Sequence, residues 1–317
     1  MTEDKEFTAL TKRALHPSFV ELNYSHHSPS SNNKPAAIDL VQKLFFTQEE
    51  RRTFYAGPKA HFGNYPGNNH PMYVADRVWG ANSTCIELTD VNRYSWDQML
   101  DEISKDMKED DIDFTGPDKK SHEHHKKIIK DVVTNWHGAY KKVSLQGEIE
   151  CEPNVVKNLG TQLDMLGRMD YRGKHAFIEY KTKPPTRYKK KDGTFSFSTK
   201  KLPADVEINH ARQTAFYWST NKDLKPFVIY VNEKEYKIFD PSNSDMLTVA
   251  AMEDHLEYYR QQSLIRENLV RASGGNINVL LSLIDPDFGH QFYWNIGEKF
   301  VNKAKQAITN ALRKESA

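Results

Sequence analysis

The chain has 317 residues, of which 38% are hydrophobic, so it can bury a sizeable core in one large domain or two unequal ones. Its formal net charge of +1 excludes a globally basic nucleic-acid binder and requires any DNA-binding surface to be local. Its two cysteines, Cys85 and Cys151, are too few for a four-cysteine iron–sulfur cluster, so we expect no such cofactor.

No apolar stretch approaches the roughly 20 residues that are needed to span a bilayer, so we expect no membrane partner. Residues 1–6 are largely acidic and form neither an apolar signal core nor a basic transit pattern. These patterns favour an intracellular, cytoplasmic protein.

Residues 1–115 are expected to form a mostly helical and irregular N-terminal region. A helix is predicted from about Ala37 to Leu44, and the capping-box pattern of residues 47–50 predicts the start of a second helix. Residues 56–85 are rich in glycine, proline, asparagine, histidine and aromatic residues, and they are candidates to line a substrate channel.

Residues 160–182 predict a β-hairpin whose turn is at Arg172-Gly173. In that register Asp164 lies opposite Lys181 and diagonal to Glu179, so the three side chains share one face. Two carboxylates and a lysine on one sheet face can hold Mg²⁺ or Mn²⁺ against a phosphodiester.

Asp170 is the alternative acidic residue. In the same register it lies on the same face but near the turn, about four residues along the strand from Glu179. Asp164 is therefore the preferred ligand. A bulge at Gly167 would change this register, so Asp170 remains its alternative. The apolar run 176–178 is typical of a strand buried on both faces, where a carboxylate and a lysine need partners or a metal.

These residues resemble the PD-(D/E)xK nuclease superfamily. Asp164 fits the Asp position of its motif, and the segment 179–181, Glu-Tyr-Lys, fits the (D/E)xK position. Downstream, Gln213 and Tyr217 form a Gln-x-x-x-Tyr element at helical spacing, which is typical of the RecB-like branch. The resemblance covers about residues 120–270 and is closest to the group of the mitochondrial genome-maintenance exonuclease and its phage-type relatives.

The resemblance implies an α/β fold with a restriction-endonuclease-like core in residues 116–317, a central mixed β-sheet flanked by helices. It implies a metal-binding histidine on a preceding helix, for which we prefer His125, with His124 and His122 as alternatives. It implies that Lys181 orients or helps to deprotonate the attacking water, and that Gln213 and Tyr217 position the substrate strand. The implied ligands of Mg²⁺ or Mn²⁺ are His125, Asp164, Glu179 and the backbone carbonyl of Tyr180.

A lysine-rich and aromatic segment, residues 187–201, lies between the catalytic strand and the Gln213 helix. Asp192-Gly193 is a hairpin signal at its centre. We expect its lysines to bind phosphates and its aromatic rings to stack on bases. The lysines are Lys189, Lys190 and Lys191, and the aromatic residues are Tyr188, Phe195 and Phe197.

The resemblance implies a metal-dependent DNA exonuclease that hydrolyses phosphodiester bonds from single-stranded ends, in a prokaryote or a phage-infected host. Two alternatives remain at this stage: a structure-specific flap endonuclease, and a non-catalytic nucleic-acid-binding protein on the same fold. The intact set of Asp, Glu, Lys, Gln and Tyr argues against the non-catalytic alternative.

Overall fold

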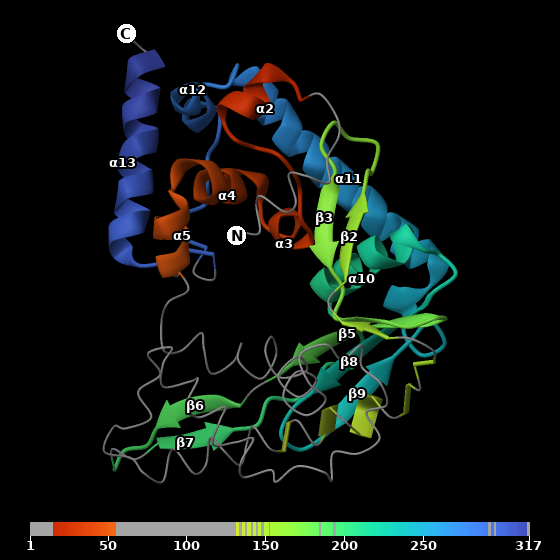
Figure 1. The fold of residues 1–317 in the computed structure, drawn as a ribbon. Coiled ribbons are helices and arrows are strands. Elements are labelled where there is room, and N and C mark those ends of the chain that lie inside the picture. Colours follow the sequence, from red (N-terminus) through yellow and green to blue (C-terminus); the bar gives the residue numbers. More distant parts are fainter. Residues whose placement is uncertain are drawn as a thin grey trace.

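The computed structural model describes residues 15–54 and 131–315 (Figure 1). Short gaps within the second range fall at residues 133–134, 137, 141, 144, 147–148, 152, 184, 193–194, 291–292 and 295. The predicted irregular region 56–85, the domain boundary near residue 115 and the three candidate histidines lie outside the described residues.

The largest sheet among the described residues is a five-stranded mixed sheet with the strand order β1-β4-β5-β8-β9 (Figure 1). Strands β5 and β8 run parallel, and the other neighbouring pairs are antiparallel. The chain is therefore an α/β protein. The strands are β1 (Glu150–Cys151), β4 (Tyr171–Arg172), β5 (Ala176–Thr182), β8 (Lys225–Val231) and β9 (Tyr236–Phe239).

Both faces of β5 are covered, as its continuous apolar run predicts. The parallel pairing of β5 with β8 requires a crossover, and this crossover contains helix α10 (Ile208–Thr220). Helix α10 packs against α11 (Val249–Ala272) on one side of the sheet. On the other side Ile178 and Tyr180 pack against Trp136, in a segment whose described residues are helical.

A separate two-stranded sheet joins the central sheet to the helices. It consists of β2 (Asn154–Lys157) paired with β3 (Met165–Arg168). A Cβ at Gly167 would lie 2.8 Å from ring atoms of both Phe216 and Tyr217, so the absence of a side chain lets β3 approach α10 closely.

The lysine-rich segment forms the predicted hairpin. Strand β6 (Thr186–Lys189) pairs antiparallel with β7 (Phe195–Ser198), and Lys189 lies opposite Phe195 at the end nearest the turn. Exposed Lys190 and Lys191 follow β6 at this end. This pairing confirms the hairpin, and its contact with DNA stays a prediction.

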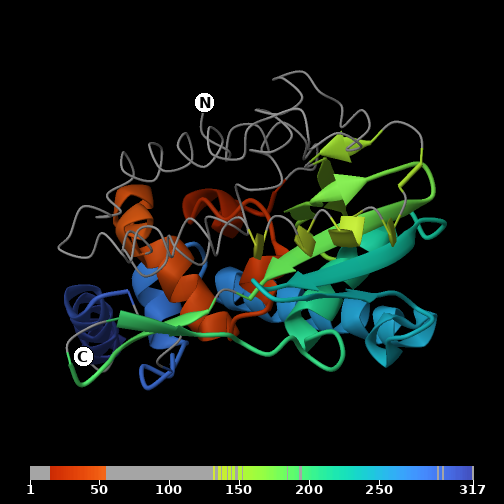
Figure 2. The ribbon, with the colours of Figure 1, turned by 90° about the horizontal axis from the view of Figure 1, so that it is seen from below.

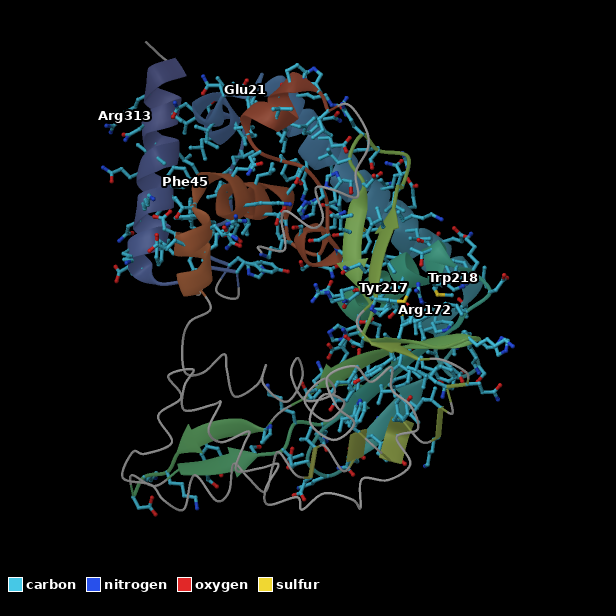
Figure 3. All side chains as sticks on the ribbon, viewed as in Figure 1. Glu21, Phe45, Arg172, Tyr217, Trp218 and Arg313 are labelled. Carbon is cyan, nitrogen blue, oxygen red and sulfur yellow. The ribbon has the colours of Figure 1, made fainter. Side chains whose placement is uncertain are left out.

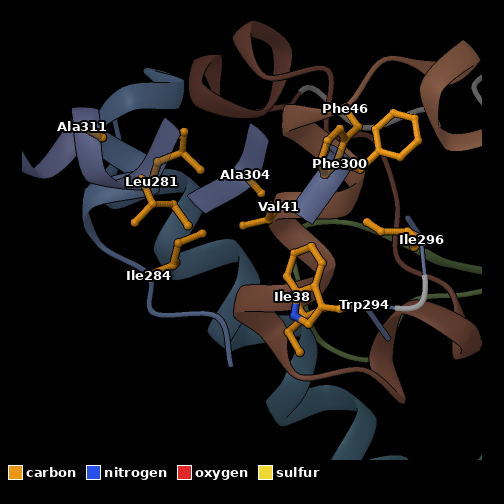
Figure 4. Packing of buried hydrophobic residues seen from close by; sticks show 11 residues of the cluster. Ile38, Val41, Phe46, Leu281, Ile284, Trp294, Ile296, Phe300, Ala304 and Ala311 are labelled. Atoms are coloured by element: carbon orange, nitrogen blue, oxygen red, sulfur yellow. The ribbon is translucent and has the colours of Figure 1, made fainter. Parts of the chain in front are cut away.

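The N-terminal helices pack on the C-terminal helices, far away in sequence (Figure 2). Ile38 and Phe46 share one core cluster with Trp294 and Phe300 (Figure 4). None of the helices in the described part of the chain is long and apolar enough to cross a membrane. The helical elements are α2 (Pro17–Glu21), α3 (Pro29–Asn32), α4 (Ala36–Leu40), the π-helix η1 (Val41–Phe45), α5 (Gln48–Phe54), the 3₁₀ helix η4 (Asp245–Leu247), α12 (Ile277–Ser282) and α13 (Glu298–Glu315).

Both helix predictions for this region are confirmed. The helix predicted from Ala37 is formed by α4 and η1. The capping box precedes α5, because Glu50 N–H donates to Thr47 Oγ1 at 3.1 Å and Thr47 N–H donates to Glu50 Oε2 at 2.9 Å.

Arg266 of α11 ties the N-terminal helices to the rest of the molecule. Its guanidinium is fully buried, with Nε 3.2 Å from Asp39 Oδ2. It also donates to the carbonyl oxygens of Ser31 and Lys34 at 2.8 and 2.7 Å. A buried ion pair with these additional hydrogen bonds is costly to break from one side, since the remaining charge loses its partner.

Replacing Arg266 with Leu should therefore lower the free energy of unfolding by about 3–5 kcal/mol, because Asp39 stays buried without a cation. The control is Arg260→Leu on the same helix, where the ion pair with Glu257 is at the surface and a much smaller loss is expected. Urea denaturation measures both. Equal losses would show that Arg266 does not tie the two segments together.

Candidate active site

The pairing of β4 with β5 differs from the predicted hairpin. Tyr171 pairs with Ile178, and the chain turns at Lys174-His175, where Gly173 N–H donates to the Ala176 carbonyl at 2.8 Å. The predicted turn at Arg172-Gly173 is therefore wrong. The predicted register is wrong as well, because this later turn places Tyr171 opposite Ile178 and not opposite Lys174. The chain between residues 164 and 172 is also not one strand but is interrupted between β3 and β4.

The observed register brings Asp170, and not Asp164, to Glu179. Tyr180 N–H donates to Asp170 Oδ2 at 2.6 Å, and Asp170 N–H donates to Glu179 Oε1 at 3.3 Å. The Glu179 side chain is 0% exposed. Two acidic side chains thus meet inside the protein, beside the start of β4.

Lys181 faces this pair from the same strand. Its Nζ donates to Glu179 Oε2 at 3.0 Å and to Gln213 Oε1 at 3.0 Å. The side chain is 16% exposed, whereas that of Glu179 is fully buried, so the ammonium lies at the boundary between the interior and the surface. The predicted proximity of Glu179 and Lys181 is confirmed.

Burial and repulsion keep the two carboxylates from ionising freely. Burial, followed by the charge of Asp170, raises the pKa of Glu179 to about 8. Burial also raises the pKa of Asp170, although Lys181 opposes this. Burial alone would lower the pKa of Lys181, but the two carboxylates raise it, so the ammonium stays charged. A divalent cation between the carboxylates would stabilise both in the ionised form.

Gln213 and Tyr217, one turn apart in α10, form a chain of hydrogen bonds with Lys181. Gln213 Nε2 donates to the Tyr217 hydroxyl at 2.9 Å, and this hydroxyl donates to the Arg168 carbonyl at 2.6 Å. Tyr217 is only 2% exposed and lies between β3 and the sheet (Figure 3). The Tyr217 hydroxyl therefore positions Gln213, and the contact of either residue with substrate stays a prediction.

Tyr180 contributes backbone groups to the site. Its ring lies on the opposite face of β5, 5.8 Å from the Trp136 ring. The N–H and C=O of one strand residue point to the same side, so the Tyr180 carbonyl faces the Asp170 side together with the N–H that bonds Asp170. The predicted use of this carbonyl as a metal ligand is compatible with that orientation.

Asp164 lies elsewhere, immediately before β3. Its Oδ1 accepts from Asn158 Nδ2 at 2.8 Å, and its carbonyl accepts from His27 N–H at 3.0 Å. Lys181, which we predicted opposite Asp164, pairs with Tyr230 of β8 instead. Asp164 thus stabilises the loop that leads into β3, and Asp170 takes its place beside Glu179.

His210 and Lys183 were not predicted and lie at the edge of the site. His210 Nδ1 is 2.7 Å from the Tyr230 hydroxyl. Burial, and then the charges of Lys181 and Lys183, lower the pKa of His210 to about 3. The sequence signal was its position three residues before Gln213, on the same face of α10.

The donors described at this site are the carboxylates of Asp170 and Glu179 and the carbonyl of Tyr180. Among the described residues no group of three or more His, Cys, Asp or Glu side chains is placed to hold a metal ion. His125, His124 and His122 lie outside those residues, so the histidine ligand stays a prediction.

Comparison with known proteins gives no family for this chain. No family model matches it, and no curated protein matches it. A solved structure, described as the crystal structure of SSO0001, aligns with a TM-score of 0.26 and 13% identity, over 68% of this chain and 93% of that chain. A likeness at this TM-score carries no argument about fold or function.

Asp170→Asn should abolish the stabilisation of the protein by Mg²⁺ or Mn²⁺, whereas Asp164→Asn should keep it. Loss of a carboxylate ligand should weaken metal binding at least about tenfold, and stabilisation falls with the affinity. Thermal unfolding at increasing metal concentration measures this effect. The opposite ranking of the two variants would contradict the site described above.

The raised pKa of Glu179 predicts a pH dependence of stability in the presence of a chelator. The unfolded chain loses the Glu179 proton near its ordinary pKa of 4.5, whereas the folded protein holds it to about 8. The free energy of unfolding should therefore fall as the pH rises through this window, by about 1.4 kcal/mol for each unit of raised pKa. Glu179→Gln should flatten this slope in chemical denaturation, and equal slopes would show that Glu179 titrates normally.

Proposed function

We propose that this chain is a metal-dependent deoxyribonuclease of the PD-(D/E)xK type, on the RecB-like branch, that hydrolyses phosphodiester bonds from single-stranded DNA ends. The observation that carries this proposal is the buried group of Asp170, Glu179 and Lys181, with Gln213 bonded to the lysine. A cytoplasmic role in DNA replication, repair or recombination accompanies the proposal.

The sheet supports a restriction-endonuclease-like core. The strand with the acidic residue and the lysine, β5, pairs antiparallel with the strand before it and parallel with β8 after a helical crossover. Glu179 of β5 and Asp170, the residue immediately before β4, meet where β4 begins, so the acidic groups are held by the sheet.

The donor set suits a hard divalent cation. Asp170, Glu179 and the Tyr180 carbonyl offer oxygen atoms, which Mg²⁺ and Mn²⁺ prefer. When bound there, such an ion would polarise the scissile phosphate and lower the pKa of a bound water. The raised pKa of Glu179 is consistent with a carboxylate that loses its proton when the cation binds.

The ammonium of Lys181 has a defined part in this reaction. The neighbouring carboxylates raise the pKa of Lys181, so the ammonium is protonated and donates hydrogen bonds. Glu179 and Gln213 fix its position from two sides, which suits it to orient the nucleophile and to stabilise the negative charge that develops on the phosphate.

The buried charges also argue against a non-catalytic binding protein. Two buried carboxylates and a lysine are costly to keep in the interior, and apolar residues of similar size are often at least as stable. A protein that only bound DNA would have no need of this group. A catalytic use of the ionised groups accounts for the cost.

Lys181→Met should lower the rate of DNA cleavage by at least about a hundredfold while DNA binding stays near that of the unchanged protein, because the ammonium acts on the reacting phosphate. Lys157→Met is the control, a lysine outside the site that bonds the Ser219 carbonyl. The assay uses end-labelled linear and circular single-stranded DNA with Mg²⁺ or Mn²⁺. Cleavage of circles would indicate an endonuclease, and no metal-dependent cleavage of any substrate would overturn the proposal.

Lys190→Ala with Lys191→Ala should weaken binding of single-stranded DNA and reduce the slope of log affinity against log salt by about 0.7 for each lost phosphate contact. Turnover at saturating DNA should change little, because the β6–β7 hairpin is separate from the Asp170 site. The matched control removes two lysines of α13, Lys299 and Lys305. An unchanged slope in the hairpin variant would mean that the hairpin does not contact phosphate.

A further inference from the structure

A strip of one arginine and three aromatic rings lies next to the candidate active site and is not used by the catalytic proposal. It consists of Arg212 of α10, Tyr258 of α11, and His290 and Tyr293 from the segment before α13; all four side chains are half-buried. We call these four residues the Arg212 strip.

Arg212 has an unusual environment for an arginine in this fold. Its guanidinium lies 3.5 Å from the centre of the Tyr258 ring, and its Nε is buried without a hydrogen-bond partner. The arginines of α11 each pair with a carboxylate: Arg260 with Glu257, Arg266 with Asp39, and Arg271 with Glu267. Within the described part of the chain Arg212 has no such carboxylate, so its planar set of donors remains available for an anion.

The two other rings are attached to the same part of α10. His290 and Tyr293 stack with ring centres 4.4 Å apart. The Tyr293 hydroxyl donates to the Asn33 carbonyl at 3.0 Å, and Asn33 Nδ2 donates to the Asn209 carbonyl at 3.2 Å, three residues before Arg212. The ring pair is thus fixed relative to Arg212 by a short chain of hydrogen bonds.

The Arg212 strip lies on the same two helices, α10 and α11, as residues that reach the catalytic group. Gln213, the next residue after Arg212, accepts from Lys181. Tyr259 is the next residue after Tyr258. Burial is the main cause that raises the pKa of Tyr259; the charge of Arg212 lowers this pKa, and the charge of Glu179 raises it. The charges of Arg212 and of Glu179 therefore both reach the same tyrosine.

We infer that the Arg212 strip binds the single DNA strand that leads to the catalytic site, with a phosphate on Arg212 and bases on the rings of Tyr258, His290 and Tyr293. An arginine binds phosphate oxygens through two parallel N–H donors, and aromatic rings stack on bases of any sequence. A duplex would not fit in the same way, since its bases already stack on one another. This inference rests on the proposed nuclease function and specifies the strand preference of that site.

The test measures binding of a fluorescent oligothymidylate and of a duplex by anisotropy, in a Lys181→Met background with Mg²⁺, so that cleavage does not interfere. Arg212→Gln should weaken single-strand binding about tenfold and reduce the salt slope by about 0.7, while duplex binding changes little. The single-strand affinity of Arg212→Lys should lie between that of Arg212→Gln and that of the unchanged protein, because lysine keeps the charge and loses the planar guanidinium. His290→Ala should weaken binding without changing the slope, since stacking releases few counterions.

The matched control is Arg260→Gln, which removes a surface arginine from α11 and should leave binding unchanged. A loss in Arg212→Gln no larger than in this control, or an equal loss for duplex, overturns the inference. If Arg212→Gln does not fold, as judged by thermal unfolding, Arg212→Lys and His290→Ala decide the question by the same criteria. If the unchanged protein cleaves DNA and these variants bind DNA normally, the inference is wrong and the nuclease proposal stands. Weakened binding without any cleavage by the unchanged protein refutes the nuclease proposal and leaves the strip as a binding surface.

Discussion

The repulsion between two buried carboxylates is the constraint on which the rest of this structure depends. Asp170 and Glu179 meet in the interior with Lys181 as their cation, so the group is one positive charge short of neutrality when both acids are ionised. A raised pKa of Glu179 is the consequence in the protein alone. An arrangement that is unfavourable without a ligand and favourable with a divalent cation is typical of a site built for function.

The surrounding fold keeps this group together. The Tyr180 N–H binds the Asp170 side chain. The antiparallel pairing of β4 with β5 places Asp170 opposite Glu179. From the other side, Tyr217 connects Gln213 to the Arg168 carbonyl, so α10 and β3 hold the partner of Lys181. The Tyr180 N–H and the Arg168 carbonyl are backbone groups of regular strands, which makes the positions of the side chains precise.

The sequence predicted the local parts of the site and missed a part that depends on tertiary packing. The proximity of Glu179 and Lys181 was predicted correctly, because alternate residues of one strand share a face. Asp170 was ranked below Asp164 because we placed the turn at Arg172-Gly173, whereas the chain turns two residues later, at Lys174-His175, which moves Asp170 opposite Glu179. In addition, β3 ends at Arg168 and β4 begins at Tyr171, and no local pattern predicts the close contact of Gly167 with α10. The packing of residues 15–54 on the C-terminal helices was missed for the same reason, since it joins segments far apart in sequence.

The most direct test of the account is a crystal structure of the protein with Mn²⁺, in which anomalous scattering locates the metal independently of any assumption about its ligands. The account predicts Mn²⁺ between the carboxylates of Asp170 and Glu179, within coordination distance of both and near the Tyr180 carbonyl. Mn²⁺ bound by Asp164 and not by Asp170, or no Mn²⁺ at Glu179 at saturating concentration, would contradict it.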